Sequence, residues 1–168
     1  MIGSRLVFGL PYAGVIKMSK YRDYVLVLWG DEFEEVAATI FVTGLREAGL
    51  RVKVVGLTPP HIAGAHGLAL VPDLTLDQAL ALAEHAICVV IPYASPGFKR
   101  LKNDPRIPAL LSQAQANQAK VILGPLHEAD LAQSGLLLVS PEQVIVYPDN
   151  GALMEFVHKL GGSLGLTN

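Results

Sequence analysis

The chain has 168 residues, of which 51% are hydrophobic and 17% charged, and its net charge is −2. This length corresponds to one domain with a sizeable core, and the apolar composition excludes an intrinsically disordered chain. The small net charge provides neither a basic surface for nucleic acid nor a polybasic patch for a membrane, so we expect neither as a partner. The single cysteine, Cys88, excludes an intramolecular disulfide and a multi-cysteine metal site, and favours a reducing cytoplasm.

Residues 1–20 precede the first predicted strand and contain a short apolar run. An apolar run, Leu6–Ile16, is interrupted by Pro11 and is too short to span a bilayer. It is a poor signal peptide, because only Arg5 precedes the run and no small-residue cleavage site follows. We expect either that Met18 is the natural start or that residues 1–20 pack as an irregular arm on a single domain formed by residues 21–161.

The first structural unit is a strand, a helix and a second strand. Tyr24–Trp29 is continuously apolar and predicts a buried strand, and Phe33–Ala48 carries apolar residues at helical spacing. Gly49 follows as a helix-terminating glycine, and Arg51–Leu57 predicts the second strand. Two parallel strands joined by a helix form a right-handed unit in nearly all proteins.

The rest of the chain continues this alternation. A connection rich in Pro and Gly, Thr58–Gly67, includes short extended segments around residues 61–63 and 68–71, which suggest a hairpin-like excursion. The further expected elements are a short helix ending near His85, a strand at Ala86–Pro92, a helix at Asn103–Ala119 with Asp104 as N-cap and Pro105 as first helical residue, a strand at Lys120–Leu123, a short helix to Gln133, strands at Leu136–Val139 and Gln143–Tyr147, a helix at Gly151–Leu160, and a frayed tail at 162–168.

Alternating strands and helices with short links predict an α/β fold: a three-layer α/β/α sandwich around a flavodoxin-like, doubly wound, mostly parallel sheet. Open sheets of this kind place their sites at the carboxyl ends of the strands. The acidic cluster Asp31, Glu32, Glu34 and Glu35 follows the first strand at such a position. Glu34 is either a solvated partner of the helix dipole or a ligand-binding carboxylate.

Common cofactor and catalytic motifs are absent from the sequence. There is no GxGxxG after the first strand, no GxxxxGK[ST], no HExxH and no GxSxG. The five histidines are scattered without ligand spacing, so we expect no cofactor and no metal. Cys88 lies within an apolar strand, where a cysteine most often acts as a small buried hydrophobe.

Several segments together nevertheless resemble a known family. They are Asp31-Glu-Phe-Glu-Glu-Val36, the helix end Ala48-Gly49 with Val52 beyond, His66-Gly67, Val71-Pro-Asp-Leu-Thr-Leu76, a strand ending at Pro92, the strand Val121–Leu123 and the closing helix Leu153–Leu160. In this combination the chain resembles the DJ-1/PfpI (ThiJ/PfpI) family over about residues 24–160. Members of that family carry a nucleophilic cysteine at a strained strand-to-helix turn, and a glutamate of the first helix tunes its reactivity.

The resemblance assigns the nucleophile and the partner glutamate to residues whose side chains have neither a thiol nor a carboxylate. The nucleophile turn corresponds to Gly124-Pro125-Leu126-His127, with the nucleophile position falling on Pro125. The partner glutamate corresponds to Ala37. The Pro-Gly-Gly whose backbone amides serve the family's site is replaced by Pro92-Tyr93-Ala94. Pro125 suits the first turn of a helix.

These replacements predict a non-catalytic domain that acts by protein–protein or small-ligand binding, and the resemblance implies a homodimer. The candidate pocket residues are Asp31, Glu34, Tyr93, Pro125 and His127. The alternative is a hydrolase of the same family, of protease, glyoxalase or deglycase type, with relocated catalytic residues, for which Glu34 and His127 are the candidates. A small-molecule sensor that uses the crevice at the carboxyl ends of the strands is a third possibility.

Overall fold

The computed structural model describes residues 24–57, 63–93, 101, 103–125 and 140–165. The strands are β1 (Tyr24–Trp29), β2 (Arg51–Gly56), β3 (Leu74–Thr75), β4 (Ala86–Ile91), β5 (Lys120–Leu123) and β6 (Val144–Val146). The helices are α2 (Glu35–Glu47), α3 (Leu76–Leu80), α5 (Arg106–Ala116) and α7 (Asn150–Gly165), with single turns of 3₁₀ helix η1 (Ala83–His85) and η3 (Pro141–Gln143).

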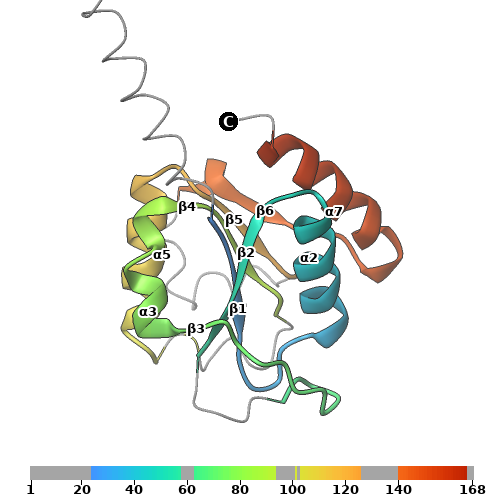
Figure 1. The fold of residues 1–168 in the computed structure, drawn as a ribbon, viewed down its shortest axis with the longest axis horizontal. Helices are drawn as coiled ribbons and strands as arrows, with labels where there is room; N and C mark the ends of the chain where they lie inside the picture. The colour runs from blue at the N-terminus through green and yellow to red at the C-terminus, as the bar shows by residue number, and fades with distance from the viewer. Residues whose placement is uncertain (1–23, 58–62, 94–100, 102, 126–139, 166–168) are drawn as a thin grey trace, which may run out of the picture.

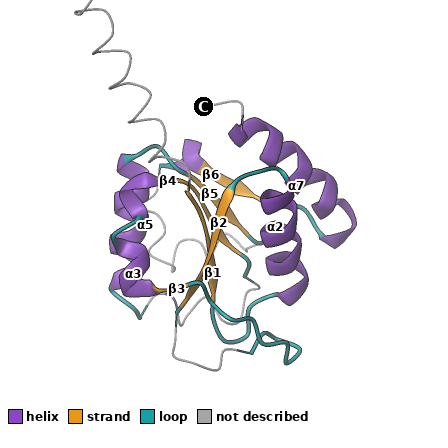
Figure 2. Ribbon diagram, in the orientation of Figure 1, coloured by secondary structure: helices purple, strands orange, loops and turns teal. Residues whose placement is uncertain are grey.

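The strands form one six-stranded sheet in the order β3-β2-β1-β4-β5-β6, and every pair is parallel. Figures 1 and 2 show α2 and α7 on one face of the sheet and α3 and α5 on the other. This arrangement confirms the predicted three-layer, doubly wound α/β fold.

The central strand β1 explains why the sheet has two cores. Val25 and Val27 pack in the cluster that includes α2 and α7, whereas Leu26 and Leu28 pack in the cluster beneath α3 and α5. Successive side chains of a strand point to opposite faces, so a strand covered on both sides needs an unbroken apolar sequence. Residues 25–29 are all fully buried, which accounts for the composition of this strand.

Helix α2 begins later than the expected Phe33. The Phe33 N–H donates to the Gly30 carbonyl at 3.2 Å, and its ring packs edge-on against Trp29 and Tyr93. Glu34 then has an extended backbone, with φ −74° and ψ 109°. Burial of the Phe33 ring therefore fixes a turn where helical spacing alone predicts the helix.

Helix α7 ends later than the expected Leu160, so the frayed tail predicted from residue 162 is wrong as far as Gly165. Gly161 packs closely against Ala48 at the end of α2, and Leu164 is buried in the same core. Because these contacts stabilise the last turn, the helix continues through a glycine-rich sequence that disfavours it locally. The expected arm at 1–20, the helix to Gln133 and the strand Leu136–Val139 lie outside the described residues.

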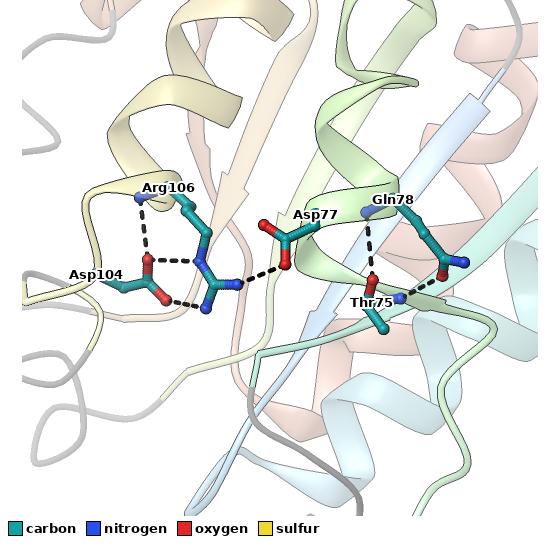
Figure 3. Close-up of polar contacts among 5 residues, drawn as sticks. All are labelled: Thr75, Asp77, Gln78, Asp104 and Arg106. Carbon is teal, nitrogen blue, oxygen red and sulfur yellow. Dashed lines mark hydrogen bonds and ion pairs between the residues drawn. The ribbon is translucent and has the colours of Figure 1, made fainter.

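Figure 3 shows how the first turns of α3 and α5 are joined. Asp104 accepts hydrogen bonds from the Arg106 backbone N–H and from the Arg106 guanidinium, which also contacts Asp77 of α3 at 3.1 Å. The carboxylates of Asp104 and Asp77 raise the pKa of Arg106 above its usual range. Thr75 and Gln78 form a reciprocal capping box at the start of α3. Asp104 thus accepts an N–H of the first turn, but its predicted place as N-cap is wrong by one residue, because Pro105 is the N-cap and α5 starts at Arg106.

Side chains cover the outer edge of β2 where the short strand β3 does not reach. The Asp73 carboxylate accepts the Val54 N–H at 2.8 Å, and the Arg46 guanidinium donates to the Val52 carbonyl at 3.2 Å. Arg46 and Asp73 also pair with each other at 2.9 Å. Backbone groups that a neighbouring strand would otherwise bind are thereby satisfied.

Candidate functional site

The crevice between β1 and β4 is the switch point of the sheet, because β1 connects to β2 on one side and β4 lies on the other. Ligand sites of open α/β sheets occur at the carboxyl ends of such strands. Glu34, at the start of α2, lies at this point, and its N–H donates to the Pro92 carbonyl directly after β4 at 3.1 Å. The sequence therefore brings one predicted site residue to the expected edge.

The partner of Glu34 is Tyr147, which follows β6. The Tyr147 hydroxyl donates to Oε2 of Glu34 at 3.0 Å, and the Tyr147 N–H donates to the Leu123 carbonyl at 2.9 Å. Burial, followed by the Glu34 carboxylate, raises the pKa of Tyr147 well above its usual value. The phenol therefore stays protonated and acts as a hydrogen-bond donor to the carboxylate.

Gly124 closes the space beside this pair. A Cβ at position 124 would lie 2.1 Å from the Tyr93 carbonyl oxygen and 2.8 Å from the Tyr147 hydroxyl. Only glycine allows the segments after β4 and β5 to approach so closely. Pro125, at the predicted nucleophile position, is exposed. The backbone at Gly124 thus packs directly against the Tyr93 carbonyl and the Tyr147 hydroxyl.

The other predicted pocket residues do not all join this cluster. The Tyr93 ring packs edge-on against Phe33, with centroids 4.6 Å apart, and only 1% of Tyr93 is exposed. Its side chain is therefore part of the core, and its carbonyl is the group that faces Gly124. Asp31 lies in the exposed turn after β1, and His127 lies outside the described residues.

Neither the position that the resemblance assigns to the partner glutamate, Ala37, nor the single cysteine, Cys88, is exposed. Ala37 is fully buried on α2, in the same core cluster as Cys88. Burial raises the pKa of the Cys88 thiol to about 12, so the nucleophilic thiolate is not populated near neutral pH. The interpretation of Cys88 as a buried hydrophobe is confirmed.

Sequence reasoning favoured Glu34 and missed Glu35, which is the buried acid of this region. Glu35 is 6% exposed, and its carboxylate accepts the N–H groups of His66 and Leu68 while contacting His66 Nδ1 at 2.8 Å. Burial acts to raise its pKa, but these hydrogen bonds outweigh burial and lower the pKa to about 2. Glu35 shares the spacing of buried Ala38 and Leu45, which is the sequence signal that identifies it.

The Glu35 carboxylate holds the excursion that follows β2. Residues Ala63 and Ala69 form an antiparallel bridge, as the hairpin-like expectation predicted. A Cβ at Gly64 would lie 2.4 Å from Cγ of Glu35, so the excursion lies directly against the carboxylate. This arrangement is a structural clamp between α2 and residues 63–69.

The described residues provide neither a metal site nor a membrane-spanning helix. Within the described ranges, no three side chains of His, Cys, Asp or Glu come together as a metal site. No helix in the part of the chain that the structure covers is both long and apolar enough to cross a bilayer.

The doubly wound sheet with its site at the β1–β4 switch point places the chain in the flavodoxin-like α/β class. The sequence model of the DJ-1/PfpI family matches residues 23–124, more than half of the chain and up to the residue before Pro125. The chain belongs to the DJ-1/PfpI family. A comparison with curated proteins finds no match.

Solved structures agree with this assignment at the level of the fold. Drosophila melanogaster DJ-1beta is 20% identical with a TM-score of 0.71, and the match covers 84% of this chain and 90% of that one. A mutant of a DJ-1 superfamily protein from Salmonella typhimurium is 20% identical, with a TM-score of 0.70 and coverage of 84% and 90%. Oxidised Toxoplasma gondii DJ-1 is 18% identical, with a TM-score of 0.67 and coverage of 86% and 97%.

Proposed function

We propose that this protein is a non-catalytic DJ-1/PfpI-family domain that acts by binding another protein or a small ligand. A homodimer is the first partnership that we propose, and the lone buried cysteine favours the cytoplasm as its compartment. The family assignment concerns the fold and the relatives of the chain. The proposal adds that the crevice described above binds a partner or ligand and does not catalyse a reaction.

The observation that carries the proposal is the close packing around Gly124, the residue before Pro125. Gly124 lies against the Tyr93 carbonyl and the Tyr147 hydroxyl, and Tyr147 is itself hydrogen-bonded to Glu34. A nucleophilic mechanism needs an activated side chain with room for a substrate beside it. The only thiol of the sequence lies in β4, fully buried and with a raised pKa.

The first experiment measures turnover by the purified full chain. Methylglyoxal tests glyoxalase activity, a glycated amino acid tests deglycase activity, and a fluorescent casein tests proteolysis. We expect each rate to equal that of a heat-denatured sample. Sustained turnover of any of the three substrates would overturn the proposal.

A second experiment tests the thiol directly. Iodoacetamide reacts with thiolate, so alkylation of Cys88 should be slow in the native protein and fast after unfolding in urea. Intact-mass spectrometry measures both rates on the same sample. Rapid alkylation of the native chain would show that Cys88 is accessible, and would remove the main argument against nucleophilic chemistry.

The alternative with relocated catalytic residues is separated by two variants. If turnover is found, Glu34→Gln and His127→Ala distinguish its origin. Loss of activity in both variants would support relocated chemistry, whereas unchanged activity in both would exclude these residues. Tyr147→Phe adds a readout for the hydroxyl that holds Glu34.

A further inference from the structure

The joint between β6 and α7 contains an asparagine followed directly by a glycine. Asn150 is the first residue of α7 and Gly151 the second, and both are exposed. This is the one Asn-Gly pair in the sequence, since Asn103 precedes an aspartate and Asn117 a glutamine. Asparagine is among the chemically labile residues. Its side-chain amide reacts when the main-chain nitrogen of the next residue reaches it, and glycine hinders that approach least because it has no Cβ.

The main-chain nitrogen of Gly151 is held by an exposed side chain. The first four N–H groups of a helix have no acceptor within the helix. The Gly151 N–H donates to Oδ1 of Asp149 at 3.2 Å, and Asp149 is itself exposed. The carboxylate of Asp149 therefore caps the first turn of α7. Helix ends open at little cost in free energy, so this cap is what keeps the nitrogen away from the Asn150 amide.

The space around Gly151 is open. Apart from its chain neighbours, a Cβ at position 151 would meet one atom within 4 Å among the described residues, Oδ1 of Asp149 at 3.4 Å. A ring that closes between Asn150 and Gly151 therefore displaces no packed side chain. Asn117 differs in this respect, because its Nδ2 donates to the Ala86 carbonyl at 2.8 Å in a half-buried position.

We propose that Asn150 is a site of spontaneous deamidation, and that the Asp149 cap on the first turn of α7 limits its rate. The Gly151 main-chain nitrogen attacks Cγ of Asn150 and gives its proton to water. The bond from Cγ to the side-chain nitrogen breaks, and that nitrogen takes up a proton and leaves as ammonia. The resulting succinimide ring then adds one water. Opening at Cγ yields aspartate and opening at the main-chain carbonyl yields isoaspartate, with no change of oxidation state.

The two products change α7 in different ways. Aspartate at position 150 adds a negative charge at the N-terminal end of the helix, where the helix dipole favours it. Isoaspartate adds one atom to the main chain before Gly151, so the first turn loses its helical geometry. Leu153, which is fully buried, follows within the same turn, so the change reaches the core. This modification is separate from the proposed function, which uses neither Asn150 nor Gly151.

The test incubates the folded full chain in a mildly alkaline buffer and follows its peptides by mass spectrometry over time. Exchange of the amide for a carboxylate shifts the peptide mass, and chromatography separates the aspartate and isoaspartate forms. We expect Asn150 to convert at least about tenfold faster than Asn103 and Asn117 in the same sample. In Gly151→Ala, the added methyl group should slow conversion of Asn150 at least about tenfold.

A second pair of variants tests the cap. Asp149→Ala removes the acceptor of the Gly151 N–H, whereas Asp149→Ser supplies a hydroxyl, which is also a good helix cap. Both remove the charge of Asp149, so the difference between them reports the cap alone. We expect Asn150 to convert about fivefold faster in Asp149→Ala than in Asp149→Ser. Circular dichroism checks that all variants fold.

The inference fails if the folded chain converts Asn150 no faster than Asn117, or if Gly151→Ala leaves the rate unchanged. Equal rates in Asp149→Ala and Asp149→Ser would show that the cap does not limit the reaction. None of these results bears on the turnover assays, so the inference and the proposed function fail separately.

Discussion

A single carboxylate, that of Glu35, joins the first helix to the excursion after β2. It accepts two backbone N–H groups, those of His66 and Leu68, from a segment 31 and 33 residues away in the chain. Its Cγ and carboxylate group lie where a side chain at position 64 would otherwise be. The clamp therefore depends on three local features together: the buried acid, the glycine and the turn at His66.

Removal of this carboxylate should destabilise the domain. In Glu35→Ala the two N–H groups lose their buried acceptor, and we expect a loss of about 1–3 kcal/mol in the free energy of unfolding. Urea denaturation followed by circular dichroism measures it. Glu155→Ala is the control, because Glu155 pairs with Lys159 on the exposed side of α7 and its removal should change stability little. Equal effects of the two substitutions would refute the clamp.

Glu35 also makes the stability of the domain depend on pH, and we expect stability to fall as the pH falls. The folded-state pKa of Glu35 is lowered from 4.5 to about 2, so its contribution to stability is complete above pH 4.5 and is lost as the pH falls towards 2. Asp104, whose pKa is also lowered, acts in the same direction. We therefore expect the stability difference between the unmodified chain and Glu35→Gln to shrink on acidification. A difference that stays constant over this range would contradict the assignment.

At this scale the sequence predicts some site residues and not others. Glu34 was found from its place after the first strand, which is a local property. Tyr147 was missed, because it lies 113 residues away from Glu34 and only the sheet order brings the two together. Glu35 was overlooked although its position on the buried side of α2 is readable from helical spacing.

Among the elements, the close approach of the segments after β4 and β5 depends on one glycine. Gly124→Ala would place a methyl group 2.1 Å from the Tyr93 carbonyl, and we expect the resulting overpacking to cost about 1–3 kcal/mol in thermal or urea unfolding. Gly162→Ala is the matched control in α7, where an added Cβ meets nothing within 4 Å. It should stabilise the helix by about 0.5–1 kcal/mol. Opposite signs are the expected result, and a neutral Gly124→Ala would contradict the geometry.

Element boundaries were predictable where burial alone decides them. β1 and β5 have the predicted limits, because each is an apolar segment of a sheet covered on both faces. The start of α2 and the end of α7 were not, since the packing of Phe33 and of Gly161 and Leu164 overrides local preference. These contacts involve partners that only the folded chain brings together.

For the whole molecule, self-association should be visible in thermal stability. If two copies form the proposed homodimer, the melting temperature should rise with protein concentration, because only folded chains associate. Differential scanning fluorimetry at several concentrations measures this. A melting temperature that is independent of protein concentration would argue against a dimer.

The fold as a whole was predictable from the alternation of apolar strands and amphipathic helices, whereas the order of the strands depends on contacts between distant segments. The family assignment came from short motifs spread along the chain, and the match over residues 23–124 agrees with it.

The Arg46–Asp73 pair has a consequence for the exposed edge of the sheet. A bare strand edge is a template on which any extended chain can grow, and growth of that kind has no natural end. Because these two side chains occupy the backbone groups of β2 that β3 leaves unpaired, that edge offers an incoming strand little to bind. The described edge of the sheet is thereby protected against open-ended pairing between strands.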